Sequence, residues 1–203
     1  NFIWAKHVGG DGNDVGSSIA TDGNNNIYIT GFFVDIADFD PGPTTFNLTN
    51  DGLGKNTFVL KLDQNGNFIW AKHNGSSSTN STNDIFVDQF ENIYLTGYFY
   101  ATTDFDPGIN TQNLTSNGSA DIFIQKLDSD GNLEWVKQIG SDFNDRAYSI
   151  VVDNSEYIYV SGSFETEVDF DPSDETYLLN TNGSNDIFIL KMDIEGNLIW
   201  AKS

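Results

Sequence analysis

The stretch Asp186-Ile-Phe-Ile-Leu-Lys-Met-Asp-Ile-Glu-Gly-Asn-Leu-Ile-Trp-Ala-Lys202 predicts a β-hairpin: an apolar strand, a tight Gly-Asn turn and a second strand closed by Trp. The same pattern occurs at 56–72 and 121–137, and its second strand occurs once more at 1–6. The spacings between successive tryptophans are 66, 65 and 65 residues. They are Trp4, Trp70, Trp135 and Trp200. Repetition at this period predicts a propeller, a solenoid or an array.

The composition favours an all-β fold. The chain has 203 residues, of which 38% are hydrophobic and 14% aromatic, with 16 Phe and 8 Tyr. These are mostly β-favouring side chains, and no segment has a sustained helical period. We therefore expect a packed core with almost no helix.

The charge balance excludes several partners. There are 9 Lys and Arg against 30 Asp and Glu, for a net charge of −21, which argues against nucleic-acid binding and against anionic membrane surfaces. Divalent cations commonly neutralise such a surface, although acidity also simply keeps an exposed protein soluble. No run of about 18 apolar residues is present, so we expect no membrane insertion. The absence of Cys excludes disulfides, thiolate zinc sites and cysteine nucleophiles.

Each unit contains the strands of one propeller blade. In the first unit we expect main strands at 16–22, 26–33, 56–63 and 67–72, and a short extra strand at 45–49. The strand cores, such as Phe-Val-Leu at 58–60, are apolar toward both faces, which is typical of a sheet covered on both sides. One unit alone cannot cover its own faces, so the units must stack.

The repeat sets the expected boundaries. Residues 1–6 are the last strand of a preceding repeat, and the full repeats are 7–72, 73–137 and 138–203. Because the chain begins and ends on the same strand, without an initiator Met or a signal peptide, we expect a piece of a longer array. The expected partners are adjacent repeats of the same chain or of another copy, and a surface glycan or protein.

Four motifs recur in order: Gly-Asn-x-x-Trp-Ala-Lys, Asp-x-x-x-Asn-Ile-Tyr-Ile-Thr-Gly, Asp-Phe-Asp-Pro-Gly and Asp-Ile-Phe-Ile-x-Lys-Leu-Asp. Together they resemble the SBBP β-propeller repeat over essentially the whole chain. The resemblance implies a secreted or surface-exposed bacterial protein with a seven-bladed propeller and no defined catalytic residues. Two features depart from it: unit 2 has Asn80-Ser-Thr-Asn-Asp84 where the first unit has Asp14 and Gly16 and the third has Asp145, and three units are too few to close a ring.

The Asp-Phe-Asp-Pro loops are the strongest candidate site. In each loop two carboxylates lie two residues apart in an extended segment and point the same way, which suits Ca²⁺ with its preference for several oxygen ligands. The alternative is a rigid proline turn whose carboxylates accept backbone N–H groups. The candidate ligands are Asp38, Asp40, Asp104, Asp106, Asp169 and Asp171.

The other recurring residues favour structural roles. The Asp-x-x-Gly-Asn turns, such as 63–67, resemble part of a calcium loop but are typical of tight hairpins. The tryptophans suit packing between blades better than carbohydrate stacking. His7 and His73 are expected at the surface, and the repeated mid-strand lysines are expected to pair with carboxylates such as the strand-end Asp. These lysines are Lys61, Lys126 and Lys191.

No motif for catalysis is present: the chain lacks a Gly-x-Ser-x-Gly elbow, a Walker loop and a dinucleotide fingerprint. We therefore expect a non-catalytic structural or adhesive segment of a secreted or cell-surface protein, such as a surface fibre. The runner-up is a glycan- or ligand-binding propeller, and a polysaccharide-acting enzyme ranks third. A ligand site requires one unit to differ, and the most divergent segment, 76–80, is expected to be a linker tip.

Overall fold

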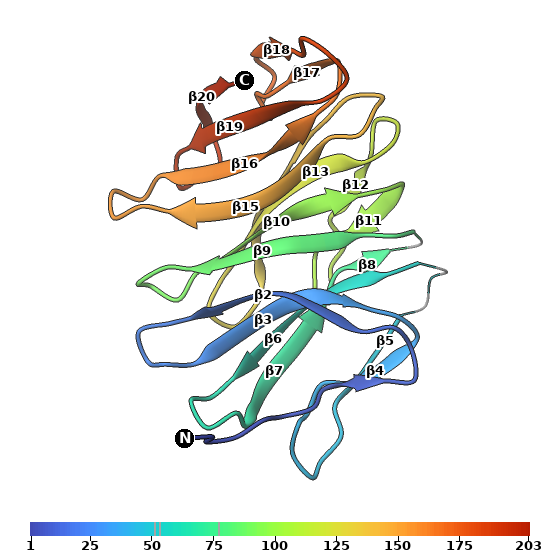
Figure 1. Ribbon diagram of the computed structural model, residues 1–203, viewed down its shortest axis with the longest axis vertical. Helices are drawn as coiled ribbons and strands as arrows, with labels where there is room; N and C mark the ends of the chain where they lie inside the picture. The colour runs from blue at the N-terminus through green and yellow to red at the C-terminus, as the bar shows by residue number, and fades with distance from the viewer. Residues whose placement is uncertain (51, 53, 77) are drawn as a thin grey trace.

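The computed structural model describes residues 1–50, 52, 54–76 and 78–203, and every regular element in this part of the chain is a β-strand. No described segment is a helix long and apolar enough to cross a membrane. Three four-stranded antiparallel sheets, here called blades, are stacked along the long axis of the molecule, with the two chain ends at opposite ends of the stack (Figure 1). The stack is open, as expected for three units.

Each blade has its strands in chain order across the sheet. Blade 1 contains β2 (Val15–Thr21), β3 (Ile27–Phe33), β6 (Asn56–Leu62) and β7 (Phe68–His73). Blade 2 contains β9 (Ser81–Val87), β10 (Ile93–Phe99), β13 (Asp121–Leu127) and β14 (Leu133–Ile139). Blade 3 contains β15 (Arg146–Val152), β16 (Ile158–Phe164), β19 (Asp186–Met192) and β20 (Leu198–Lys202). The all-β, blade-like fold predicted from the repeat is thus confirmed.

A small sheet lies beside each blade and contains the Asp-Phe-Asp-Pro loop. In unit 1 it contains β1 (Gly9–Gly10), β4 (Ile36–Asp38) and β5 (Asn47–Thr49). In unit 2 it contains β8 (Gly75–Ser76), β11 (Thr102–Asp104) and β12 (Asn113–Thr115). In unit 3 it contains β17 (Glu167–Asp169) and β18 (Leu178–Asn180). The single extra strand that we expected therefore pairs with another short strand, which contains the first Asp of the loop.

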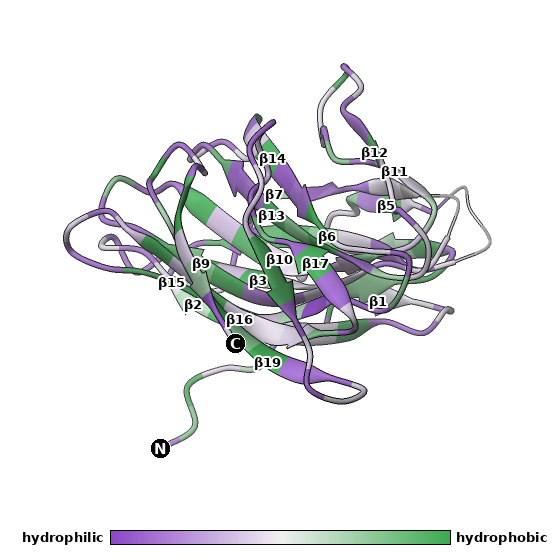
Figure 2. Ribbon diagram, turned by 90° about the horizontal axis from the view of Figure 1, so that it is seen from above, coloured by the Kyte–Doolittle hydropathy of each residue, from purple (hydrophilic) through white to green (hydrophobic). Residues whose placement is uncertain are grey.

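Neighbouring blades pack face to face. The first strand of blade 2, β9, contacts β2 and β3 of blade 1, and β15 of blade 3 contacts β9 and β10. One apolar cluster fills the space between blades 1 and 2, and another fills the space between blades 2 and 3. A third, smaller cluster covers the outer side of blade 1. Figure 2 shows hydrophobic stretches on the central strands, among them β10, and hydrophilic residues along many loops.

A glycine in the second strand of each blade allows the first strand to approach closely. The pairing of β2 with β3 shifts register between Gly16 and Ser18, opposite Gly31. A Cβ atom on Gly31 would overlap the backbone carbonyl of Val15. Gly97 and Gly162 occupy the same place in the other blades. The Thr-Gly and Ser-Gly pairs of the repeat are therefore required by a β-bulge.

Some expectations are corrected or lie outside the described residues. Residues 1–8 form no strand, whereas a strand was expected at 1–6. The repeat boundaries remain predictions. The turn expected at 50–52 and the linker tip expected at 76–80 include residues 51 and 77, which are outside the described residues.

Candidate functional site

The Asp-Phe-Asp-Pro loop is anchored by its aromatic residue. Phe39 is buried, with its ring 5.4 Å from that of Phe33 and 4.8 Å from that of Phe58. The equivalent Phe105 and Phe170 are also buried, and each packs against two phenylalanines of its own blade. The loop is therefore fixed to the blade through its central side chain.

The carboxylates of this loop accept backbone N–H groups. Asp38 Oδ1 accepts from the nitrogens of Asp40 (3.0 Å) and Phe46 (2.9 Å), and Asp40 Oδ1 accepts from Gly42 N at 2.7 Å. The side chain of Thr44 donates to Asp40 Oδ2. This is the geometry expected of the rigid turn.

The other two copies repeat this arrangement. Asp104 Oδ1 accepts from two backbone nitrogens at 3.0 and 2.8 Å, and Asp169 Oδ1 from two at 3.1 and 2.8 Å. Asp106 and Asp171 each accept one, at 2.7 and 2.9 Å. No three acidic or histidine side chains of the described residues lie close enough together to hold a metal ion. Calcium binding here stays a prediction.

The hairpin turns use the same chemistry. Asp63 Oδ1 accepts from Asn65 N and Asn67 N, both at 2.8 Å, and Asp63 Oδ2 accepts from the Asn67 side chain. These hydrogen bonds lower the pKa of Asp63. Gly66 in the turn has φ of 75°, which favours glycine. The equivalent turns at 128–132 and 193–197 repeat these bonds, so the repeated strand-end Asp is a turn residue.

Tryptophan and lysine join each blade to the hairpin turn of the next. A Cβ atom built on Gly131 of blade 2 would lie 3.0 Å from Trp70 Cη2 and 3.1 Å from Lys72 Cδ of blade 1. Lys72 Nζ also donates to Asn132 Oδ1 at 2.9 Å. The next junction repeats this contact, with Trp135 and Lys137 on Gly196, and Trp135 Nε1 donates to Ile194 O at 3.3 Å. The predicted packing role of these tryptophans is confirmed.

The repeated lysines and histidines match the expectations only in part. Lys61 pairs with Glu91 of blade 2 at 3.4 Å, and Lys126 pairs with Glu134 at 2.7 Å, so the carboxylate belongs to Glu rather than to the strand-end Asp. Lys191 Nζ lies 3.7 Å from the ring centroid of Tyr157. His7 is exposed as predicted, whereas His73 is half-buried with its ring edge against Phe33, which corrects the surface placement.

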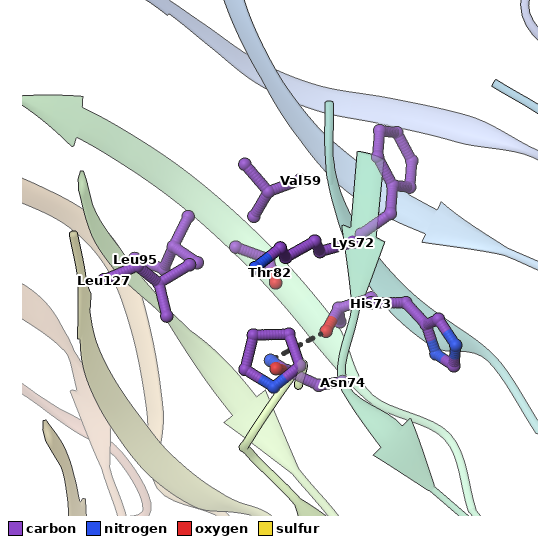
Figure 3. Close-up of a pocket in the computed structure, with 10 residues that line it drawn as sticks. Val59, Lys72, His73, Asn74, Thr82, Leu95 and Leu127 are labelled. Atoms are coloured by element: carbon purple, nitrogen blue, oxygen red, sulfur yellow. Dashed lines mark hydrogen bonds between the residues drawn. The ribbon is translucent and has the colours of Figure 1, made fainter. Parts of the chain in front are cut away.

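The gap between blades 1 and 2 is almost filled. Among the described residues, a cavity of about 10 Å³ lies at this junction. Figure 3 shows Val59 of blade 1 on one side of it, Leu95 and Leu127 of blade 2 on another, and Thr82 between them. Beside this gap, the Asn74 side chain donates to Thr57 Oγ1 at 3.3 Å and to Gln125 Oε1 at 3.0 Å. This cavity is too small for a ligand larger than a water molecule.

Unit 2 departs from the other units where it contacts both neighbours. Asp84 Oδ1 accepts from Ser18 Oγ of blade 1 at 2.7 Å, and Asp84 Oδ2 accepts from Ser149 Oγ of blade 3 at 2.8 Å. Its repeat equivalents are these two serines. Asn80, the other departure, accepts from Tyr100 N at 3.4 Å, just as Asp145 accepts from Glu165 N at 2.9 Å. The divergent residues of unit 2 therefore perform structural roles.

Two buried carboxylates lie near the junction of blades 2 and 3. Burial raises the pKa of Asp121 to about 6, although Gln138 Nε2 and Asn117 N donate to its Oδ2. Its Oδ1 is buried and has no hydrogen-bond partner among the described residues. Burial also raises the pKa of Asp145, which accepts from Ser141 N and Glu165 N. Neither carboxylate was among the candidates, because only the fold buries them.

One cluster breaks the repeat. Arg146, the only arginine of the sequence, donates to Tyr100 Oη at 2.8 Å, and its guanidinium carbon lies 4.8 Å from the ring centroid of Tyr98. The neighbouring Tyr148 is half-exposed. The repeat equivalent of Arg146 in unit 2 is Ser81. This cluster was not predicted from the sequence, although a single arginine among the repeats is a signal that marks it.

Comparison with known proteins agrees with the fold. Residues 3–31 and 134–163 match the family model described as SBBP, the β-propeller repeat. The chain is also 28% identical to the uncharacterized WD repeat-containing protein L264 of Acanthamoeba polyphaga mimivirus, in an alignment that covers 98% of this chain and 16% of that protein. Each matched segment contains a Trp residue of the repeat, Trp4 or Trp135, and most of the first two strands of the blade that follows it. The chain is thus similar to the SBBP β-propeller repeat over these two segments, in agreement with its blade-like sheets.

Proposed function

We propose that this chain is a non-catalytic structural or adhesive repeat segment of a secreted or cell-surface protein. The single observation that supports this role is where the recurring polar and aromatic residues act. In each unit the repeated Asp residues accept hydrogen bonds that fix turns, and in units 1 and 2 the Trp and Lys residues contact the next blade. The residues that recur in every repeat thus stabilise turns and contacts between blades and do not form a pocket. This suits a load-bearing or spacing element.

Surface exposure is the property to test first. An antibody raised against this chain is expected to label intact, unpermeabilised cells of the source organism, and mild external protease should remove the label. An antibody against a cytoplasmic protein of the same cells is the control for leakage. Labelling that appears only after permeabilisation would contradict the proposal.

Calcium is proposed as a stabilising ligand of the Asp-Phe-Asp-Pro loops. One oxygen of Asp38 and one of Asp104 are bound to backbone N–H groups, which leaves the second oxygen of each carboxylate to face a cation. Binding would raise the melting temperature and give heat in a calorimetric titration. The Asp40→Asn, Asp106→Asn and Asp171→Asn triple variant is expected to lose both signals. Absence of heat, with a melting temperature unmoved by chelator, would exclude calcium.

A ligand- or glycan-binding propeller is the second candidate, and the Arg146 cluster favours it. Arg146 of unit 3 lies beside Tyr98 and Tyr100 of unit 2, and its sequence neighbour Tyr148 is half-exposed. Aromatic rings and guanidinium groups are common in carbohydrate and carboxylate recognition. A glycan-array signal lost in Arg146→Ser would support this function, whereas a signal unaffected by this change, or no signal, would argue against it. Turnover in a polysaccharide hydrolase screen would instead support an enzyme.

A further inference from the structure

A small pocket lies between blades 2 and 3, where the turn after β9 meets the turn after β15. It has a volume of about 100 Å³. The turn of blade 2 contributes Asp88 and Phe90 to its lining, and the turn of blade 3 contributes Asp153 and Glu156. None of the described residues that line the pocket is basic. The pocket is therefore acidic and has an aromatic ring in its wall.

At the junction of blades 1 and 2, the carboxylate equivalent to Glu156 has two partners from the preceding blade. This carboxylate belongs to Glu91, whose Oε1 accepts from the Asn24 side chain at 2.6 Å. Its Oε2 pairs with Lys61 Nζ at 3.4 Å. An amide and an ammonium group of blade 1 thus satisfy the carboxylate of blade 2.

The amide partner is absent at the junction of blades 2 and 3. Phe90 occupies the repeat position of Asn24, and its phenyl ring cannot donate a hydrogen bond to Glu156. The Phe90 side chain is 62% exposed beside the pocket. Unit 3 has Ser155 at this position, so the aromatic residue is specific to unit 2.

The ammonium partner is engaged elsewhere. Lys126, the repeat equivalent of Lys61, pairs with Glu134 of its own blade at 2.7 Å. Units 1 and 3 have isoleucine at the position of Glu134, so this competing carboxylate is also specific to unit 2. Among the described residues, the Glu156 side chain therefore has neither a hydrogen bond nor an ion pair.

We propose that this pocket binds a lysine or arginine side chain of a partner protein. Its cationic group would pair with the Glu156 carboxylate, as Lys61 pairs with Glu91, and lie against the exposed ring of Phe90. Asp88 and Asp153 add negative charge, although their oxygens already accept N–H groups of their own turns. The net charge of −21 attracts a basic partner at longer range.

The size of the pocket favours a single side chain over a whole small molecule. About 100 Å³ is well below the roughly 300–1,000 Å³ of typical small-molecule sites. A lysine or arginine side chain combines an apolar stem, which can pack on Phe90, with a charged end that reaches Glu156. The inference rests on the proposed adhesive role, to which it adds the chemistry of a partner.

An NMR titration with the capped peptide Gly-Gly-Lys-Gly-Gly at physiological ionic strength tests the site. Saturable shifts are expected for the backbone amides of 86–91 and 152–156. The same peptide with norleucine in place of lysine keeps the stem without the charge and should give no such shifts. Phe90→Asn, which copies unit 1 and leaves the net charge unchanged, should abolish the shifts, and so should Glu156→Gln.

Glu175→Gln is the charge-matched control for Glu156→Gln. Glu175 is exposed in the loop between β17 and β18 and does not line the pocket, so this variant should bind the lysine peptide as the wild type does. Circular dichroism and melting temperature verify that each variant is folded.

Four results would overturn the proposal. They are an absence of shifts at 86–91 and 152–156, equal shifts with the norleucine peptide, shifts that survive either Phe90→Asn or Glu156→Gln, and loss of binding in Glu175→Gln, which would indicate general charge attraction. Stronger shifts of the same amides by glucosamine would overturn the assignment to a protein side chain. A chain that labels intact cells but does not bind the peptide would refute this site while leaving the proposed function intact.

Discussion

Blades 2 and 3 share the strand sequence Asp-Ile-Phe-Ile but differ in what surrounds it. In β13, Asp121 and Ile122 are buried between two neighbours, whereas in β19 the equivalent Asp186 is half-buried and Ile187 is mostly exposed. The strands pair in the same register with the second strand of their blades. The comparison shows that the strand pairing of a blade is determined by the sequence of its own unit. The burial of one face of the blade depends on packing by the next unit.

Truncating the equivalent isoleucines should give the largest difference between the two blades. Ile122→Ala removes packed methyl groups from a closed junction and is expected to lower the free energy of unfolding by about 2–5 kcal/mol. Ile187→Ala removes mostly exposed groups and should change it by less than about 0.5 kcal/mol. Urea unfolding with matched m-values measures both. Equal losses would show that the next blade does not determine burial.

Asp121 and Asp186, the residues before these two isoleucines, should differ in how they affect stability as the pH changes. Because burial raises the pKa of Asp121 to about 6 in the folded chain, against 3.8 when unfolded, its ionisation opposes folding above pH 6. This cost disappears as the pH falls from about 6 to 3.8, since the folded state then binds the proton more tightly. Asp121→Asn, which copies Asn56 of unit 1, should stabilise the chain at pH 7 by roughly 2 kcal/mol and lose that advantage on acidification.

Asp186→Asn is the matched control for this pH series. Asp186 is half-exposed and accepts from Asn182 N at 2.8 Å, so the variant should leave the stability of the chain at pH 7 nearly unchanged. Chemical unfolding at a series of pH values compares the two substitutions. An Asp121→Asn variant less stable than wild type at pH 7 would contradict the account of the buried carboxylate.

Substitution of Trp70 in blade 1 and of Trp200 in blade 3 should give a smaller difference in the free energy of unfolding. Trp70 and Trp200 each pack edge-on against a tyrosine of their own blade, at ring distances from Tyr28 and Tyr159 of 6.3 and 6.4 Å. Only Trp70 also covers Gly131 of a following blade. Trp70→Ala should therefore cost about 1 kcal/mol more than Trp200→Ala in urea unfolding. If Trp200→Ala were the costlier change, the contact with the next turn would have no stabilising role.

No difference in stability is expected between substitutions at equivalent positions of blades 1 and 3 that have the same exposure. Ile69 and Ile199 occupy equivalent places and are both 44% exposed. Ile69→Ser and Ile199→Ser should each change the free energy of unfolding by less than about 0.5 kcal/mol. A melting curve of each variant checks this, and a loss in Ile69→Ser alone would mean that the junction extends further than the observed contacts.

The sequence predicted the repeat, the four strands of each blade, the packing role of its Trp residues and the Gly of its hairpin turns, because these depend on local pattern and spacing. Partners that come from another unit were not predictable: Lys61 reaches Glu91 across a junction, and Asp84 links Ser18 and Ser149. A period of 65 residues identifies equivalent positions but not the register between blades. The different burial of Ile122 and Ile187 was equally hidden, since their local sequences are the same.

Hydrogen exchange by mass spectrometry at high dilution tests the central claim most directly, that the neighbouring blade provides the burial. Residues 124–127 and 189–192 are both paired with a strand on each side within their own blades, so they differ mainly in what covers their faces. The account predicts that 189–192 exchanges faster, through local opening of the uncovered blade, while 124–127 exchanges with the most stable part of the chain. Equal protection of the two segments would contradict it.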